Sequence, residues 1–388
     1  MTADRSQGEV ELTYEVVTDR TRLAALAPNW DELVRAMPRP SPFLLHGWVE
    51  RWWAAFGEGR RLAVPVARRK GRLVAALPCF IQRSAGLRVA GFLGAHESAL
   101  ADAMLAPGED ERIVGTLIAH LRPEADLVDV FGLPARSRLA SAATGSLHLI
   151  ARVESPVLEM PDGWDSAYRR HTSVKKRALH ERRRRQLAEL GAVRIDVARV
   201  AADLERVLEE AFELHQKRWK GRPDGSTFGT PGGRAFHRDA IRAIAPHGVP
   251  RIVTLRVAGQ LVAFHYFFAL ERTMYVHRLA FDPALARISP GQICTLEALR
   301  AASEEGLRRV EFLGGAERYK AELADSFEPM HQGLGLATTL PGHLAVAARA
   351  IQIDIRLRLK RSETLRRLYY EGLARPRAFL VRKRDGGR

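Results

Sequence analysis

Two stretches decide the fold of this chain: residues 62–83, LAVPVARRKGRLVAALPCFIQR, and residues 251–270, RIVTLRVAGQLVAFHYFFAL. Each reads as two apolar strands joined by a tight turn that contains one glycine, Gly71 in the first stretch and Gly259 in the second. Glycine suits such a turn because it adopts positive φ without steric strain. The residues after the two glycines also match, Arg-Leu-Val-Ala against Gln-Leu-Val-Ala, so the stretches resemble copies of one hairpin.

The similarity extends beyond the hairpins. In each half we expect a third strand, a helix and a fourth strand to follow, and the fourth strands, Leu127–Gly132 and Arg309–Gly314, both place one acidic residue between apolar ones. Self-similarity at a long period indicates duplication. We therefore predict an α/β protein with mixed sheets, built as two duplicated lobes (residues 1–160 and 161–345) and a basic helical tail (residues 346–388).

Composition excludes several classes of protein. Hydrophobic residues make up 46% and charged residues 27% of the 388 residues, which is typical of globular domains. Cys79 and Cys294 are the only cysteines and lie far apart, so we expect neither a disulfide framework nor a bound metal. The N-terminus lacks a signal-peptide pattern and no apolar run is long enough to span a membrane, so we expect a cytoplasmic protein.

The net charge of +16 is concentrated in two segments. Residues 165–190 contain nine Lys/Arg against three Asp/Glu, and residues 345–388 contain thirteen against four. Such basic surfaces suit phosphate groups, anionic lipid or RNA, although a solvated arginine-rich helix face is an equal alternative.

Several stretches of the second half resemble the GNAT superfamily of acetyltransferases. Within it they are most similar to the CelD-like group associated with exopolysaccharide biosynthesis, which is related to the Fem-type aminoacyltransferases. The stretches that carry the resemblance are His171–Gly191, His215–Trp219, Gly259–Phe268, Ser289–Gly291 and Glu311–Lys320, with a weaker match at Pro42–Phe43 and Trp48–Gly57. The resemblance implies transfer of an acyl group from acetyl-CoA or another acyl-CoA to an amine or hydroxyl.

A turn before the helix expected over residues 291–305 is the candidate cofactor site. Ser289 suits an N-cap, Pro290 suits the first helical turn, and Gly291 would let a ligand approach the backbone. Free amides and the helix dipole favour a phosphate there, and Arg287 would add a charge-assisted contact. GNAT proteins hold the CoA pyrophosphate at this turn, although an ordinary capped helix has the same sequence.

The preceding strand completes the candidate cofactor site. The resemblance implies that a backbone N–H on this strand polarises the acyl carbonyl, and the residues in question are Arg278, Leu279 and Ala280. The first copy has Glu109, Asp110 and Glu111 at the matching helix start, and these carboxylates would repel pyrophosphate. We therefore expect the second lobe alone to bind the cofactor.

Five residues are candidates for catalysis. Glu311 lies between apolar neighbours on the fourth strand, where a raised pKa would suit a general base, and Asp282 and His277 are alternatives. The resemblance implies that Tyr319 protonates the departing thiolate and that Lys320 lies near the reaction centre. Asp129 occupies the position of Glu311 in the first copy, which favours a structural origin for this carboxylate.

The acceptor site is less defined. His215, Arg218 and Trp219 share one helix face and would line an acceptor pocket, although a tryptophan that anchors the helix in the core is the more common arrangement. Lys175 begins a basic run that would grip an anionic acceptor. The partners expected are therefore an acyl-CoA and an unidentified acceptor, with a polysaccharide precursor favoured by the resemblance.

Two other functions remain open. Fem-like aminoacyl transfer from tRNA would use both basic segments, and a scaffold at an anionic membrane surface would use the tail. The sequence contains no Walker A loop, no Gly-x-Gly-x-x-Gly, no Gly-x-Ser-x-Gly and no zinc finger. Nucleotide hydrolysis, dinucleotide chemistry, serine hydrolysis and sequence-specific DNA binding are therefore disfavoured.

Overall fold

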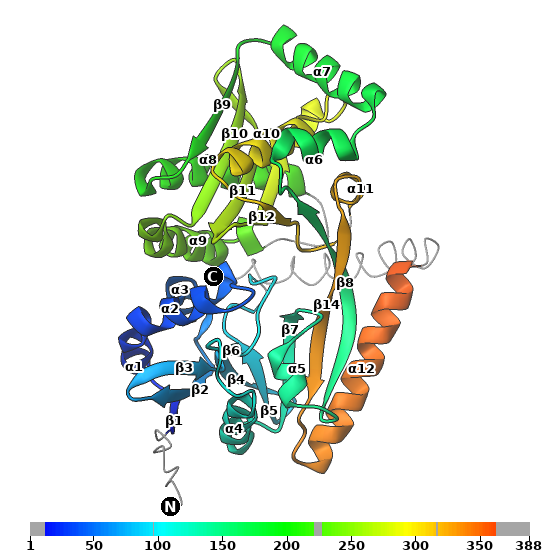
Figure 1. Ribbon diagram of the computed structural model, residues 1–388. Coiled ribbons are helices and arrows are strands. Elements are labelled where there is room, and N and C mark those ends of the chain that lie inside the picture. The colour runs from blue at the N-terminus through cyan, green and yellow to red at the C-terminus, as the bar shows by residue number, and fades with distance from the viewer. Residues whose placement is uncertain (1–11, 96, 221–226, 316, 362–388) are drawn as a thin grey trace, which may run out of the picture.

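Two lobes stack end to end, each with its own twisted sheet and helices (Figure 1). This computed structural model describes residues 12–95, 97–220, 227–315 and 317–361. The two sheets join into one 14-stranded sheet that runs through both lobes. The mixed α/β fold predicted from the hairpins is confirmed.

The N-terminal lobe contains the first seven strands and five helices. Its strands are β1 (Leu12–Val17), β2 (Arg61–Arg69), β3 (Arg72–Ala76), β4 (Cys79–Ser84), β5 (Leu87–Phe92), β6 (Met104–Leu105) and β7 (Leu127–Leu133). Its helices are α1 (Arg20–Ala25), α2 (Ala27–Ala36), α3 (His46–Phe56), α4 (Arg112–Leu121) and α5 (Arg138–Ala142), with 3₁₀ turns η1 (Pro42–Leu44) and η2 (Arg122–Glu124).

The C-terminal lobe has a similar order of elements but begins with two additional helices and has fewer strands. Its strands are β9 (Val193–Ala198), β10 (Pro250–Val257), β11 (Gln260–Leu270), β12 (Thr273–Phe281) and β13 (Arg309–Glu311). Its helices are α6 (Trp164–His171), α7 (Val174–Glu189), α8 (Ala201–Trp219), α9 (Pro231–Ile244), α10 (Pro290–Glu304) and α11 (Arg318–Ala321), with 3₁₀ turns η3 (Thr227–Gly229), η4 (Ala245–His247) and η5 (Pro283–Leu285).

Strand pairing shows that the lobes are copies of one fold. In both, an antiparallel hairpin is followed by a helix and a final strand that pairs in parallel. One strand lies between hairpin and helix in the second lobe, as expected, but β4, β5 and β6 lie there in the first. In the first lobe the parallel pair is β5 with β7, where Val89 faces Leu127. In the second it is β12 with β13, where Thr273 faces Arg309. The predicted equivalence of the two fourth strands is therefore confirmed.

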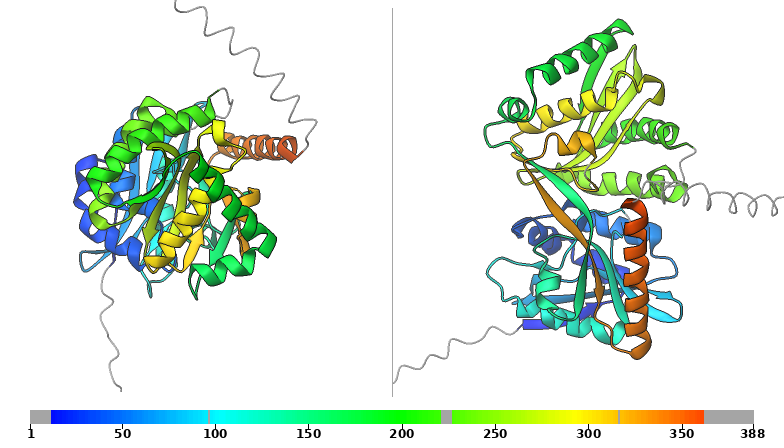
Figure 2. Two further views of the ribbon diagram at one scale, coloured as in Figure 1. Left: turned by 90° about the horizontal axis from the view of Figure 1, so that it is seen from above. Right: turned by 90° about the vertical axis from the view of Figure 1, so that its right-hand side faces the viewer.

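The lobes exchange their last strands. β8 (Leu147–Glu159) leaves the N-terminal lobe and pairs with β13 of the C-terminal lobe, whereas β14 (Ser326–Gly335) returns and pairs with β7. β8 and β14 also pair with each other from Ser326 to Gly335, and they cross between the lobes as two long strands (Figure 2). Because each lobe needs the other's strand, separation of the lobes would break both sheets.

The two faces of the C-terminal sheet have different surroundings. Phe264, Tyr266 and Phe268 of β11 belong to a core that continues into the N-terminal lobe. Phe267 of the same strand packs in a second core with residues of α10 such as Leu299. The sheet therefore separates an inter-lobe face from an outer face covered by α6, α7 and α10.

One helix expected over residues 166–190 is two helices. The chain bends between α6 and α7 at Thr172 and Ser173, and the Ser173 side chain accepts a hydrogen bond from the Lys176 amide at 3.2 Å. This capping hydrogen bond starts a new helix. The C-cap of α7 is Leu190 rather than the expected Gly191, which follows it with φ +144°, a value that glycine adopts without steric strain.

The basic tail begins with α12 (Leu340–Arg361), which lies along the N-terminal lobe beside β14 (Figure 1). Val346 and Ile353 of α12 pack against Leu127 and Leu334. Large apolar side chains on the rest of the helix are exposed, namely Leu340, Leu344, Ile351 and Ile355. No helix in the described part of the chain is both long and apolar enough to cross a membrane.

Buried His265 makes the stability of the fold depend on pH. Neither of its ring nitrogens has a hydrogen-bond partner among the described residues, and burial lowers its pKa from 6.5 to about 3. The unfolded chain therefore takes up a proton at higher pH than the folded chain. The contribution of His265 to the free energy of unfolding is therefore fully present above pH 6.5 and is lost as the pH falls toward 3.

We expect His265→Gln to make the loss of stability in acid shallower. Between about pH 6 and pH 4, the slope of the free energy of unfolding against pH should decrease by up to about 1.4 kcal/mol per pH unit. Urea denaturation at several pH values measures this slope. His247→Gln, at a side chain that is 48% exposed, is the control for the substitution of histidine by glutamine. Equal slopes for the parent and His265→Gln would refute the assignment.

Candidate functional site

A cavity opens where β12 and β13 separate. The two strands pair only from Thr273 to Tyr275, so the rest of β12 has β11 on one edge and no strand on the other within the described chain. The cavity has a volume of about 460 Å³ and is lined by residues from β12, α7, α10 and α11. The lining includes Leu279, Ser289, Gly291 and Tyr319, so the structure brings predicted cofactor and catalytic residues together.

The start of α10 differs in detail from the expectation. Pro290 occupies the first turn as expected, but Ser289 adopts a left-handed conformation with φ +57° and its side chain does not cap the helix. The Gln292 amide donates instead to the Ser289 carbonyl at 3.0 Å. An added Cβ at Gly291 would lie 2.8 Å from Cδ1 of Phe281, so this glycine is required by packing as well as by any ligand.

Three cations line the cavity: Lys176, Arg183 and Arg318. Glu322 is the one carboxylate in the lining, and it accepts hydrogen bonds from Arg318 at 3.0 Å and from Lys176. Arg183 donates to the side chain of Gln292 at the start of α10. The cavity is therefore positively charged beside a helix N-terminus, an arrangement that binds phosphate groups.

Tyr319 and Lys320 have different surroundings although they are adjacent. Tyr319 lines the cavity, and burial raises the pKa of its hydroxyl, which therefore keeps its proton at neutral pH. Lys320 is 6% exposed, and its ammonium donates to the carbonyls of Leu313 at 3.3 Å and Gly315 at 3.5 Å. Lys320 thus stabilises the glycine-rich turn and does not line the cavity.

The two predicted carboxylate bases are ion paired. Glu311 is 1% exposed and accepts from Arg39 at 2.9 Å and from Arg309 at 3.0 Å. Asp282 accepts from the Lys217 ammonium at 2.6 Å; burial opposes ionisation, but this contact and the Ala284 amide hold the Asp282 pKa below its usual value. Neither carboxylate lines the cavity.

Other predicted residues lie around the cavity without entering it. Arg287 and Lys175 are exposed and do not belong to its lining. Arg218 stacks over the ring of Phe281 at 4.5 Å, and Phe281 itself lines the cavity. His215 and Trp219 stack on each other at 5.7 Å, and burial lowers the pKa of His215 to about 4.

A bulge in β12 turns two predicted residues to the inter-lobe face. The register with β11 shifts so that Tyr266 faces Arg278 and Phe267 faces Val276, leaving His277 as the extra residue. The Arg278 side chain donates to Glu97 of the N-terminal lobe at 2.8 Å. Ala280 is buried in the inter-lobe core, so Leu279 is the one residue of the Arg278–Ala280 segment in the cavity lining.

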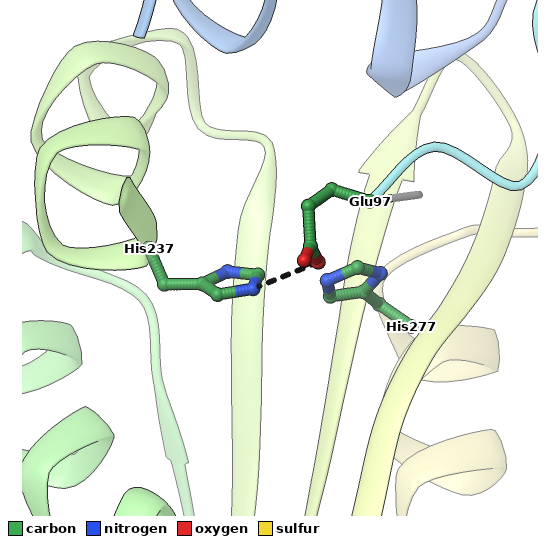
Figure 3. Close-up of side chains that lie close together, drawn as sticks. All are labelled: Glu97, His237 and His277. Atoms are coloured by element: carbon green, nitrogen blue, oxygen red, sulfur yellow. Dashed lines mark ion pairs between the residues drawn. The ribbon is translucent and has the colours of Figure 1, made fainter. Parts of the chain in front are cut away.

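Glu97 is also the centre of a cluster with His237 and His277, in which Glu97 and His237 are buried and His277 is half-buried (Figure 3). His237 comes from α9, His277 from β12 and Glu97 from the loop between β5 and β6. The Nε2 atom of His237 lies 3.4 Å from Glu97 Oε2. Sequence reasoning missed Glu97 and His237, because they lie 140 positions apart in no motif.

Comparison with known proteins agrees with this geometry. Residues 174–321 match the family described as acetyltransferase (GNAT) domain. A search of curated proteins gave no match. The matched residues include the whole cavity lining except Glu322, so the C-terminal lobe is similar to the GNAT class of acetyltransferase domains.

Solved structures share the fold of both lobes. A conserved protein of unknown function from Bacteroides thetaiotaomicron matches at TM-score 0.57 and 11% identity, over 83% of this chain and all of its own. The structure titled FemX matches at 0.56 and 7%, over 83% and 96% of the two chains. The C-terminal domain of a putative lysylphosphatidylglycerol synthetase from Agrobacterium fabrum matches at 0.51 and 12%, over 85% and 96%.

Proposed function

We propose that the protein is an acyltransferase that binds an acyl-CoA in the cavity between β12 and β13. The observation that carries the proposal is the convergence of three cations, a helix N-terminus and Tyr319 on one cavity. The cations and the start of α10 would hold phosphate groups, and the thioester would lie along the free edge of β12 beside Leu279.

In the proposed reaction, an amine or hydroxyl of the acceptor attacks the thioester carbonyl. The carbon–sulfur bond breaks, and the thiolate takes the proton of the Tyr319 hydroxyl, which its raised pKa keeps available. The proton that the attacking nitrogen or oxygen loses then restores the Tyr319 hydroxyl. A backbone amide on the free edge of β12 would stabilise the developing oxyanion. We propose structural roles for Glu311 and Lys320, because their partners already satisfy them.

The acceptor we favour is a cell-envelope polysaccharide precursor, in line with the resemblance to the CelD-like group. In this proposal, residues 161–345 form the lobe that binds the cofactor, and residues 1–160 form a lobe that binds none. The exposed apolar residues of α12 support contact of the tail with an anionic lipid surface. The remainder of the tail, residues 362–388, lies outside the described residues.

We expect Arg183→Glu to weaken acetyl-CoA binding by roughly 10- to 100-fold. The substitution replaces a charge-assisted hydrogen bond, worth about 1.5–3 kcal/mol, with repulsion. Arg182→Glu is the matched control, because Arg182 lies on the same helix but is exposed and outside the cavity. Isothermal titration of the full chain measures both, and absence of acetyl-CoA binding to the folded parent would reject the proposal.

Aminoacyl transfer from tRNA is a second candidate, favoured by the exposed cations of α7. Lys175, Arg182 and Arg185 are exposed and do not line the cavity, and such exposed cations suit a phosphate backbone. If tRNA is the donor, Arg182→Glu weakens tRNA binding. In that case neither the parent nor the Arg183→Glu variant binds acetyl-CoA measurably. The same two variants thus separate the two donors.

A further inference from the structure

The cluster of Glu97, His237 and His277 takes no part in the proposed acyl transfer. One ligand-type atom from each of the three side chains lies within 4.8 Å of the other two. Figure 3 shows the carboxylate and both imidazole rings converging from three separate elements. The residues also join the lobes, since Glu97 comes from the N-terminal lobe and the histidines from the C-terminal lobe.

Several polar atoms at this point are buried without a hydrogen-bond partner. They are both ring nitrogens of His237, Nε2 of His277 and the Tyr266 hydroxyl, considering the residues that the structure describes. His237 is fully buried, and its side chain points into the cluster. A buried polar atom left unsatisfied costs about 1–3 kcal/mol, so a group that satisfies several at once would be strongly bound.

The ionisation states suit a cation. Burial lowers the pKa of His277 well below 6.5, and burial also lowers that of His237 despite the opposing effect of Glu97. Burial acts to raise the Glu97 pKa, but His237 and Arg278 outweigh it and hold that pKa below its usual value. Two neutral imidazoles and one carboxylate are the forms in which these residues ligate a metal.

We propose that Glu97, His237 and His277 bind one divalent transition-metal ion of the zinc class and so tie the two lobes together. Imidazole and carboxylate ligands suit zinc, whose bonds of about 2.0 Å place neighbouring ligand atoms about 3.3 Å apart. Small side-chain rotations bring atoms within 4.8 Å to that spacing. The proposal replaces the expectation of no metal, which rested on spacing in the sequence.

Two neighbours would orient the carboxylate. The Thr227 hydroxyl donates to Oε1 of Glu97, and Arg278 donates to Oε2 at 2.8 Å. Each carboxylate oxygen has a second lone pair that is free to reach the metal. Such outer contacts are typical of metal sites, although the charge of Arg278 opposes a cation and would itself neutralise Glu97 if only water filled the site.

The test uses the full chain, freed of metal with a chelator and then dialysed against zinc chloride. We expect one zinc per chain by elemental analysis and a rise of a few degrees in Tm at saturating zinc. Cobalt in place of zinc should give the visible absorption of a site with nitrogen and oxygen ligands. His277→Gln and the nearly isosteric Glu97→Gln should each lose the bound metal and the Tm rise.

His265→Gln is the matched control. His265 is as deeply buried as His237, and its ring nitrogens also have no hydrogen-bond partner among the described residues. It lies beside Phe267, whose side chain belongs to the core on the other face of the sheet, and Lys320 is the charged group that acts on it. This variant should keep one zinc per chain. A folded parent that binds no stoichiometric metal, or Glu97→Gln and His277→Gln variants that retain it, would overturn the proposal and leave water and Arg278 as the partners of the cluster.

Discussion

Gly233→Ala is expected to destabilise the protein by about 3 kcal/mol, while the adjacent Gly232→Ala changes stability by less than about 1 kcal/mol. Both glycines lie in the first turn of α9, so their backbone conformations and helix propensities are nearly the same. Their surroundings differ. A Cβ at Gly233 would lie 1.8 Å from the carbonyl oxygen of Thr227, and a Cβ at Gly232 would make ordinary contact with Phe56 at 3.6 Å.

The overlap at Gly233 cannot be relieved by a side-chain rotation, because the clashing atom belongs to the backbone. The turn η3 would have to move, which would displace buried Phe228 from its contacts with Phe212 and His237. The movement would also draw the Thr227 hydroxyl away from Glu97. The effect on stability therefore extends from the helix start to the inter-lobe cluster.

Urea denaturation of the parent and the two variants measures the difference in the free energy of unfolding. Similar values for Gly233→Ala and Gly232→Ala would show that η3 adapts without cost, contrary to the prediction. Circular dichroism of the folded baselines confirms that the comparison is made between folded proteins.

Glu311→Ala is expected to cost about 3 kcal/mol in the free energy of unfolding. Glu311 is 1% exposed, and both of its arginine partners also pair with Glu328. The distance to the Glu328 carboxylate is 2.7 Å from the Arg309 guanidinium and 2.8 Å from the Arg39 guanidinium. Removal of Glu311 takes away the most buried carboxylate of the cluster and leaves its positive charge only partly compensated by Glu328. Breaking a fully buried ion pair typically costs about 3–5 kcal/mol. Because the two arginines are partly exposed, we expect a loss in the free energy of unfolding at the lower end of this range.

Glu271→Ala is the control for this prediction. Glu271 pairs with Arg35 at 3.2 Å, but both side chains are more than a third exposed. Exposed pairs contribute about 0–1 kcal/mol, so this variant should unfold almost as the parent does. If Glu311→Ala were as stable as Glu271→Ala, the ion cluster would not hold the lobes together, and a catalytic role for Glu311 would regain weight.

The elements that follow local rules could be predicted from the sequence. The two glycine turns, the apolar strands around them and the helix that starts at Pro290 all lie where their sequence signals are. One element that the sequence did not predict correctly also depends on a local interaction. The break between α6 and α7 depends on the capping hydrogen bond of Ser173, which the basic run around it obscured.

The sequence also identified four of the residues that line the cavity. Ser289, Gly291, Leu279 and Tyr319 could be selected because a turn, a strand and a glycine-rich segment have recognisable patterns. Lys176 and Arg183 could not be separated from the other cations of their run. Which cations of a helix face a cavity depends on the rotation of that helix against its neighbours, and only packing decides that rotation.

By itself, the sequence determined that the chain is a duplicated α/β fold, because hairpins, strands and caps are set by residues close together in the chain. Only the tertiary structure decided that the lobes exchange β8 and β14, because strand pairing over such distances depends on which edges are free. The same holds for the meeting of Glu97, His237 and His277. Burial and a shared inter-lobe core bring these residues together, and no spacing in the sequence records that contact.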